Sequence, residues 1–472
     1  MPPTRRAFLR AAAASAIAPV FAHGAVGQKT PPNILFCIAD DWSFGHASIY
    51  GDKTVQTPVF DRLAREGALF THSFCVAPTC TASRGGILTG QPPHRLEEGA
   101  NLWSTLPAKF ATYPDLLESA GDVIGLTGKG WGPGALGQRK RNPAGPAFRN
   151  FDAFVKSVPD DKSFCYWFGS QDPHRPYERQ LTVRMGLKRE SVAAPPFLPD
   201  TPEVRDDLLD YYAEVQRYDE NVGRMLDTLA ASGRAENTIV VVTSDNGLPF
   251  PHAKANLYDA GTRMPLAIRF PGVVKPGSVV HSLVSHLDFA PTFLELAGLK
   301  IPGEMAGRSL LGTLTGADSR TREWIFVERE RHARARAENV GYPCRAIRSE
   351  QYLYIRNFHA ERWPAGDPDL SFSQGTFSDI DAGPTKKLLL DGRDDPRIAP
   401  FFHLACDKRP AEELYDVASD PYQMRNVAGE AKLAAVRQQL WGELRKWMAD
   451  TADPRAASDT DVFDAYPYVG AR

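Results

Sequence analysis

Four stretches of hydrophobic residues within the first 250 residues of the chain each end abruptly in polar residues. These stretches are 33–39, 123–126, 164–168 and 239–242, and they are rich in β-branched and aromatic side chains. Continuous apolar runs of this length are typical of strands that are buried on both faces of a parallel sheet. Segments with helical periodicity separate them, so the pattern predicts an α/β fold with a large, mostly parallel sheet sandwiched by helices.

Two helices are marked by capping signals as well as by periodicity. Thr57 precedes Pro58 at the start of the first helix, and Gly67 is its stop signal. Thr201 and Pro202 open a longer helix whose apolar residues keep helical spacing. We expect both apolar stripes to pack in the core.

The C-terminal third of the chain predicts a second, smaller domain. Strand-like segments follow an irregular polar stretch, and they are 324–327, 344–347 and 352–355. A stretch rich in Pro, Gly and Asp, 363–396, is predicted as loop, and residues 433–447 have the amphipathic pattern of a closing helix. We therefore expect one large domain over 28–320 and a smaller α+β domain with an antiparallel sheet over 321–472.

The composition is that of an ordinary soluble enzyme, with 472 residues, of which 43% are hydrophobic. The formal net charge of -2 gives no support for nucleic-acid binding. The six cysteines are too few and too scattered for a disulfide framework, and Cys37 and Cys165 lie inside apolar runs, so we expect them in the core.

The N-terminus resembles a twin-arginine export signal over residues 1–27. Arg5 and Arg6 precede an alanine-rich apolar run that ends near Ala22, too short to span a bilayer, which needs about 20 apolar residues. The alternative is an amphipathic helix with paired arginines by chance. No later segment is apolar enough for a stable membrane anchor, so we expect a periplasmic or secreted protein that depends on the twin-arginine (Tat) export machinery.

Polar side chains suited to catalysis or to ligand binding follow the predicted strands. Asp40 and Asp41 follow the first strand, and Asp245 with Asn246 follows the last. In open α/β sheets, ligands bind outside the carboxyl ends of the strands. Carboxylate and amide oxygens suit a hard cation, and calcium is favoured over magnesium because its geometry is looser. The alternative is structural, because strand-end acids are often helix caps or turn formers.

Residues 80–90, read as CTASRGGILTG, resemble the signature of sulfatases, in which the leading cysteine is oxidised to formylglycine. The alternative is a buried cysteine at a helix start. The resemblance covers nearly the whole mature chain. The other residues that match the family are Asp40, Asp41, Lys129, His174, Asp245, Asn246, Lys254, the segment 256–265 and residues 413–416 with Asp420 and Pro421. Residues 172–175 and 254–258 are in addition similar to sulfamidases, which cleave N-sulfoglucosamine.

The resemblance implies the fold of formylglycine-dependent sulfatases, an alkaline-phosphatase-like superfamily, and the hydrolysis of a sulfate ester or sulfamate on a carbohydrate. It implies that Cys80, as formylglycine, hydrates and attacks sulfur, and that a maturation enzyme makes the formylglycine before folded export. The implied cation ligands are Asp40, Asp41, Cys80, Asp245 and Asn246. Arg84 would stabilise the hydrated aldehyde, Lys129 and Lys254 would neutralise the sulfuryl oxygens, and His174 would protonate the leaving atom.

One position departs from the family pattern, because Trp131 stands where many sulfatases carry a histidine. The general base is therefore open between His94, His252 and His174. Trp131 itself either stacks on a sugar ring or packs in the core.

The basic run from Arg329 to Arg336 is interleaved with glutamates, which predicts a solvated charged face. The competing interpretation is that part of it binds anionic groups of an oligosaccharide.

Two other functions are compatible with the scaffold. A phosphodiesterase- or phosphatase-like hydrolase would normally need a serine or threonine nucleophile and several histidines at two metal sites. A catalytically silent carbohydrate-binding protein is the other alternative, and Trp131 is its support.

Overall fold

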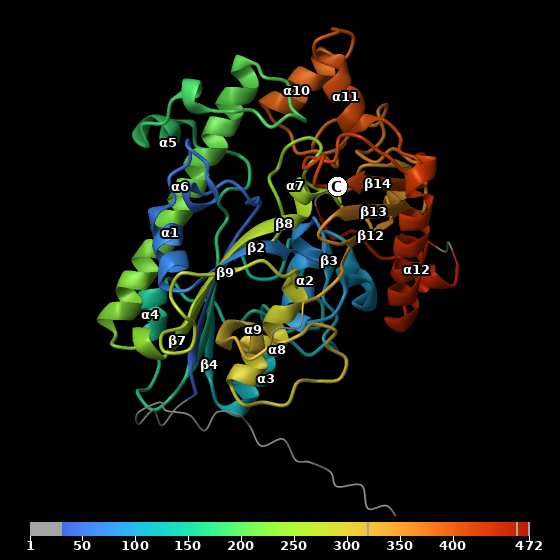
Figure 1. Cartoon of the computed structure of the whole chain (residues 1–472). Helices are drawn as coiled ribbons and strands as arrows, with labels where there is room; N and C mark the ends of the chain where they lie inside the picture. The colour runs from blue at the N-terminus through green and yellow to red at the C-terminus, as the bar shows by residue number, and fades with distance from the viewer. Residues whose placement is uncertain (1–30, 319–320, 459–460, 471–472) are drawn as a thin grey trace, which may run out of the picture.

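A computed structural model describes residues 31–318, 321–458 and 461–470 (Figure 1). The predicted export signal over 1–27 lies outside the described residues. Within those three ranges, no helix combines the length and the apolar character needed to cross a membrane.

The larger sheet of the described residues has eight strands. Along the sheet they are β10 (Val284–Ser285), β2 (Ala68–Phe74), β8 (Arg263–Arg269), β7 (Thr238–Ser244), β1 (Asn33–Ala39), β6 (Phe164–Gly169) and β4 (Val123–Gly128), with β9 (Ser278–Val280) beside β2. All neighbours are parallel except at β8, which runs antiparallel to β2 and β7. The four apolar runs form β1, β4, β6 and β7, so the predicted mostly parallel sheet is confirmed.

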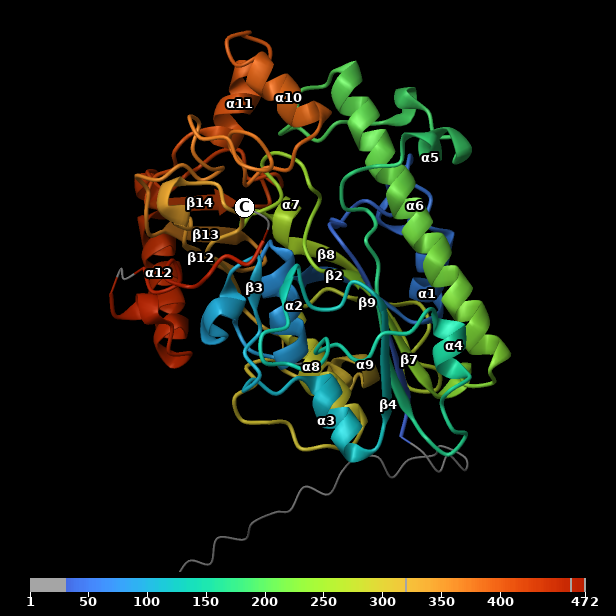
Figure 2. The same ribbon diagram turned by 180° about the vertical axis from the view of Figure 1, so that it is seen from behind.

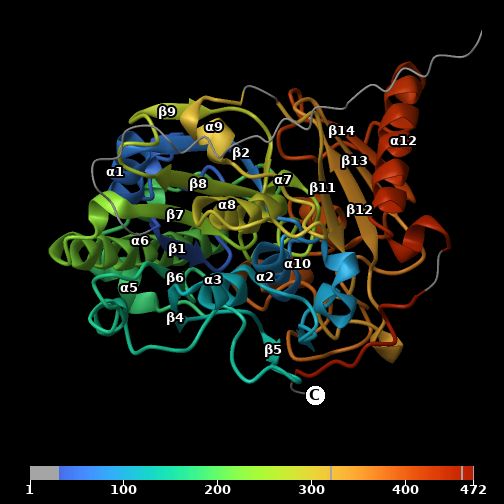
Figure 3. The ribbon, with the colours of Figure 1, turned by 90° about the horizontal axis from the view of Figure 1, so that it is seen from below.

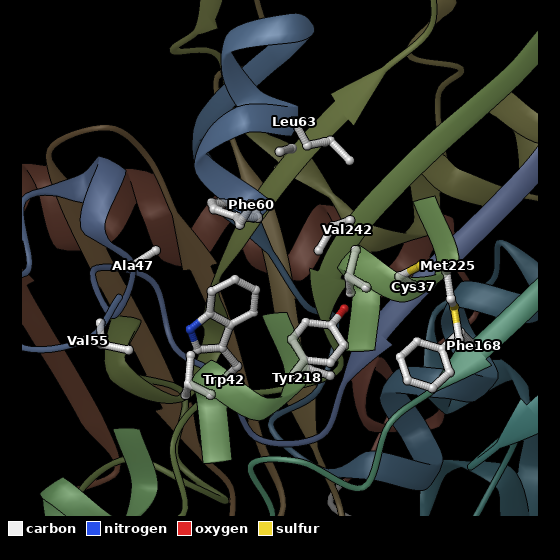
Figure 4. Packing of buried hydrophobic residues seen from close by; sticks show 14 of the residues in the cluster. Cys37, Trp42, Ala47, Val55, Phe60, Leu63, Phe168, Tyr218, Met225 and Val242 are labelled. Atoms are coloured by element: carbon white, nitrogen blue, oxygen red, sulfur yellow. The ribbon is translucent and has the colours of Figure 1, made fainter. Parts of the chain in front are cut away.

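Helices cover both faces of this sheet (Figure 3). One face packs against α1 (Pro58–Glu66), α4 (Phe151–Val155) and α6 (Pro202–Ala231), and the other against α2 (Cys80–Thr89), α3 (Tyr113–Ala120), α8 (Phe289–Leu296) and α9 (Leu311–Thr315). Successive residues of β1 alternate between the two cores, because side chains of a strand alternate between the faces. In the first core Trp42 lies edge-on to Phe60 of α1 and Tyr218 of α6 (Figure 4).

The two predicted capping signals have different outcomes. The Thr201 side chain accepts the hydrogen bond that caps α6, as expected. Thr57 occupies the corresponding position at α1 but makes no such bond. Instead, the Asp219 carboxylate of α6 accepts the backbone N–H groups of Val59 and Phe60, at 3.0 and 2.8 Å. The start of α1 is thus capped from a neighbouring helix, which a local signal cannot reveal.

A separate antiparallel sheet lies in the C-terminal part of the chain. Its order is β11 (Ile325–Arg329), β12 (Cys344–Arg348), β13 (Tyr352–Asn357) and β14 (Glu412–Asp416). Helix α12 (Ala434–Asp450) packs on it through Leu440 and Leu444, which share a core with Ile347 and Tyr354. The antiparallel sheet and closing helix agree with the predicted fold class, while the domain boundary at 320 stays a prediction.

The prediction of loop over 363–396 is wrong in part. Helix α10 (Pro384–Asp391) lies within it beside the end of α6, and α11 (Ala399–Cys406) follows and packs against α10 (Figure 2). Leu389 is buried, and the Thr385 hydroxyl donates to Asp207 of α6 at 2.6 Å. The helix is short and owes its stability to this docking, so the Pro- and Gly-rich composition around it hides the signal.

Two short α-helices and two short strands complete these elements. They are α5 (Arg179–Arg184), α7 (Asp259–Thr262), β3 (Ser104–Thr105) and β5 (Gly134–Ala135). All six cysteines are buried and unbridged, and Cys37 and Cys165 lie in the two cores as predicted.

Candidate active site

The carboxyl ends of β1 and β7 bring two polar pairs side by side. The strands are parallel neighbours with Ala39 opposite Ser244, so the residues that follow them emerge together. The Asp41 backbone N–H donates to the Asp245 carboxylate at 3.2 Å. The Asn246 amide donates to the Asp41 carboxylate at 2.6 Å. Asp41 has a φ of 79°, a left-handed conformation that aspartate tolerates better than most residues.

A pair of glycines at the ends of β4 and β6 allows Lys129 to lie beside these polar pairs. Gly128 ends β4 and Gly169 ends β6, and the two are partners in the sheet. A Cβ on Gly169 would lie 1.6 Å from the carbonyl oxygen of Lys129, so only glycine allows this approach. The Lys129 ammonium then lies 2.5 Å from the Asp40 carboxylate.

Cys80 is the first residue of α2 and is buried below these groups. Its Sγ lies 3.3 Å from Asp40 Oδ1. Burial, and then the charge of Asp40, raises the pKa of the Cys80 thiol well above its ordinary value. An unmodified Cys80 would therefore remain a protonated thiol, which is a poor nucleophile. The N-terminus of a helix also favours an anion in front of it.

Arg84 follows one turn later and is completely buried. Its Nε donates to Asp245 at 2.7 Å, and its Nη1 donates to the carbonyls of Lys129 and Gly130 at 2.7 and 3.0 Å. Arg84 thus ties α2 to the ends of β7 and β4. It supports the site from behind rather than lining its cavity.

Lys254 connects the site to the C-terminal part of the chain. Its ammonium donates to Asp41 at 2.8 Å and to Asp381 at 2.9 Å. Burial opposes the charge, but Asp381 and then Asp41 outweigh it and raise the pKa of Lys254 well above its ordinary value. His174 Nε2 lies 3.9 Å from the Asp41 carboxylate. Asp381 is a site residue that the sequence did not predict.

A cavity of about 360 Å³ opens over these groups. Asp40, Cys80, Lys129, His174 and Lys254 line it, while the other predicted site residues lie behind them. The lining also includes Leu102, Trp103, Gln171, Arg217, His332, Gln374, Asp381 and Tyr468. All nine predicted site residues therefore belong to one connected cluster.

The cluster fits a divalent cation. Asp40, Asp41, Cys80 and Asp245 each offer one ligand atom, and these atoms lie within 4.8 Å of one another. The Asn246 Oδ1 atom is buried and has no hydrogen-bond partner, so it is a ready fifth donor. Burial raises the pKa of Asp41, although the charges of Lys254 and His174 oppose this shift. The oxygen donors are those that calcium and magnesium prefer.

The Sulfatase family model matches residues 32–132 and 144–299, which is more than half of the chain. The chain belongs to the sulfatase family. It is therefore assigned as a sulfuric ester hydrolase. A second family model, "N-sulphoglucosamine sulphohydrolase, C-terminal", matches residues 251–367.

Curated relatives of this sulfatase cover nearly its full length. Human N-sulphoglucosamine sulphohydrolase is 28% identical over 93% of this chain and 94% of the relative. N-acetylglucosamine-6-O-sulfatase of Bacteroides thetaiotaomicron is 24% identical over 93% of this chain and 90% of the relative.

Solved structures support the fold. A protein in complex with its substrate, D-glucosamine-2-N,6-O-disulfate, is 22% identical with a TM-score of 0.66, over 90% of this chain and 99% of that one. The phosphonate monoester hydrolase of Silicibacter pomeroyi is 20% identical with a TM-score of 0.64, over 90% of this chain and 96% of that one. At this identity, both likenesses concern the architecture alone.

The three histidines considered as general base of this sulfatase lie in different surroundings. His174 lines the cavity. His94 is buried against Glu328, with Nδ1 2.6 Å from the carboxylate, and His252 is buried in a stack with Tyr258. Neither of these two lines the cavity. His332 does, and the sequence did not single it out; burial lowers its pKa to about 3, so it is neutral near pH 7.

Trp131 packs in the core of the sulfatase. It is 5% exposed, belongs to the core around α2 and α3, and is not among the residues that line the cavity. Of its two predicted roles, packing is the one that the structure supports.

The prediction of a solvated charged face over 329–336 is wrong. Arg329 and Arg336 are buried, and both pair with Asp379. Arg331 is buried as well, and donates to the backbone carbonyls of Tyr466 and Pro467. These three guanidinium groups are committed to internal partners, which argues against the competing interpretation for them, whereas His332 of the same run lines the cavity.

Proposed function

We propose that this sulfatase is exported and hydrolyses a sulfate ester or a sulfamate on a carbohydrate, using a formylglycine made from Cys80 and a bound divalent cation. The observation that carries the proposal is the position of Cys80. It lies at the N-terminus of α2, 3.3 Å from Asp40, in a cavity lined by two lysines and two histidines. Its raised thiol pKa favours a precursor rather than a thiol nucleophile.

The cation would be held by Asp40, Asp41, Asp245, Asn246 and the oxidised side chain of residue 80, and we favour Ca²⁺ over Mg²⁺. When bound, it supplies positive charge that draws the sulfate and activates the nucleophile. Without the divalent cation, the cluster has an excess of negative charge, because four carboxylates face three basic side chains. The carboxylates are those of Asp40, Asp41, Asp245 and Asp381, and the basic side chains are Arg84, Lys129 and Lys254. An anionic substrate is favoured only after a divalent cation reverses this balance.

The chain's own residues divide the remaining tasks. Lys129 and Lys254 line the cavity from two sides of the carboxylate pair and would neutralise the oxygens of the bound sulfate. His174 is about one-third exposed and is in reach of the cavity, so it would protonate the leaving oxygen or nitrogen. Arg84 would hold α2, and with it residue 80, in place.

The relatives support a sulfated carbohydrate as the substrate, because those named above act on sulfated glucosamine derivatives. The choice between an O-sulfate and an N-sulfate remains part of the proposal. The twin-arginine resemblance supports a periplasmic or secreted location. Because twin-arginine substrates cross the membrane folded, a cytoplasmic maturation enzyme would have to oxidise Cys80 first.

The test is mass spectrometry of the peptide that contains Cys80, from protein made together with a maturation enzyme. We expect an aldehyde at residue 80, and turnover of N-sulfoglucosamine or glucosamine 6-O-sulfate that Cys80→Ala abolishes. A thiol at residue 80 in an active protein would refute the mechanism. An aldehyde without turnover of any sulfated sugar would refute the activity and favour a silent binding protein.

A further inference from the structure

The last described segment of the chain, 461–470, returns to the candidate active site. Figure 3 shows the red end of the chain running toward β5 of the larger sheet's domain. Hydrogen bonds from both parts of the molecule hold the segment. Asn101 donates to the carbonyl of Phe463, and Arg331 donates to the carbonyls of Tyr466 and Pro467. The backbone N–H of Gly341 and the guanidinium of Arg362 donate to the Asp464 carboxylate. It is therefore a built part of the fold.

The segment also stabilises an unusual conformation at Trp103. Trp103 has a φ of 55°, a left-handed conformation that is costly for a bulky residue. The Val469 backbone N–H donates to the carbonyl of Trp103 at 2.8 Å, and Leu102 beside it donates to the carbonyl of Arg331 at 3.0 Å. Strained residues of this kind gather at sites that bind ligands, since the surrounding structure must maintain them.

Trp103 and Tyr468 line the same cavity as Cys80. Their ring centroids lie 6.4 Å apart, and both side chains are partly exposed. The Arg331 guanidinium lies 5.8 Å from the Tyr468 ring and supports it from the protein side. The lining also includes Asp40, Lys129 and Lys254, so the cavity presents charged groups as well as aromatic rings.

We propose that Trp103 and Tyr468 form the wall that binds the sugar ring of the substrate, so that the C-terminal segment completes the substrate site. The inference rests on the proposed function, because it takes the sulfate to bind at Cys80. A pyranose ring has apolar C–H faces as well as polar edges, and aromatic rings are the side chains that match such faces. A cavity of about 360 Å³ is also near the lower limit of ligand sites, which suits one sulfated sugar ring.

The test compares Tyr468→Ala and Trp103→Ala with the conservative variant Tyr468→Phe, which keeps the ring, and with one control, Val469→Ala, which changes an exposed neighbour. The first measurement is kcat/KM for the sulfated glucosamine that the wild type hydrolyses best. We expect each alanine variant of the aromatic pair to lower it about tenfold through KM, which corresponds to about 1.4 kcal/mol of lost contact. Tyr468→Phe should recover most of the kcat/KM that Tyr468→Ala loses because the ring remains, and the Val469→Ala control should stay within about twofold of the wild type.

The second measurement is the inhibition constant of inorganic sulfate, which carries the anionic group of the substrate but no sugar ring. It should be unchanged in Tyr468→Ala if this residue binds the sugar ring. An equal weakening of sulfate inhibition would mean that the tail merely supports the fold, and an unchanged kcat/KM would also overturn the inference. If the wild type hydrolyses no sulfated sugar, the proposed function fails instead, so the two failures are distinguishable.

Discussion

Lys254 and Asp381 form a buried pair whose strength can be measured. Lys254 is 3% exposed and bridges Asp41 and Asp381, which are 0% and 12% exposed. Lys254→Met keeps most of the side-chain volume but leaves two carboxylates without their cation. Removing one partner of a buried ion pair typically costs about 3–5 kcal/mol. Asp381→Asn should cost only about 1 kcal/mol, because Lys254 keeps its bond to Asp41.

The double variant Lys254→Met/Asp381→Asn is the informative one. Since Asp381 is then neutral, only Asp41 remains unpaired, and we expect the combined loss to be about 2 kcal/mol smaller than the sum of the single losses. The free energy of unfolding is measured by urea titration in excess chelator, so that no bound cation compensates for Asp41.

A matched control is Lys156→Met, which breaks the exposed pair with Asp152 in α4. The two side chains are 74% and 49% exposed, so the cost should be below about 0.5 kcal/mol. Additivity of the Lys254 and Asp381 variants within about 0.5 kcal/mol would refute the contact between Lys254 of the candidate site and Asp381 of the C-terminal loop.

Three other predictions concern the cation, a second buried pair and pH. Chelation should lower the melting temperature, and Ca²⁺ at a hundred times the wild-type Kd should restore about 2.7 kcal/mol of stability to the wild type. At the same Ca²⁺ concentration Asn246→Ala should gain less, and equal gains in variant and wild type would exclude Asn246 as a ligand. Asp379→Asn should cost about 3–5 kcal/mol in urea, because it weakens the pairing of both Arg329 and Arg336, whereas a cost below about 1 kcal/mol would contradict that pairing. Burial lowers the pKa of His286 to about 3, so below pH 6.5 the unfolded chain binds the extra proton and stability should fall, by about 1.5 kcal/mol between pH 6.5 and 5. His286→Gln should remove this share of the pH dependence, and an unchanged slope in urea titrations would contradict it.

The fold and most of the candidate site could be predicted because their signals are local. The strands β1, β4, β6 and β7 are buried on both faces, so their apolar runs are visible in any short window. Asp40, Asp41, Lys129, Asp245 and Asn246 directly follow those strands, and residues 80–90 form one contiguous motif. The parallel arrangement then brings the strand ends to one edge.

Asp381, His332 and Tyr468 could not be predicted in this way. They lie in a loop, after a strand and in the terminal segment, where no periodic pattern marks a side chain for the cavity. Only the packing of the second sheet against the first domain brings them to Cys80. The role of Trp131 could not be predicted from the sequence either. Its position two residues after Lys129 suggested a place in the site, but its side chain packs in the core.

The sequence by itself determined the family, the mostly parallel sheet and the residues at its carboxyl edge, because burial pattern and motif spacing are properties of neighbouring residues. The tertiary structure decided which charges are paired. Arg329 and Arg336 resemble a solvated face in the sequence, yet Asp379, over forty residues away, neutralises both in the interior. It also decided what surrounds the candidate active site, since Asp381 and the aromatic pair Trp103 and Tyr468 meet there through contacts between distant segments. The energy of a buried charge or a shaped cavity depends on partners in space, and a linear pattern does not specify those partners.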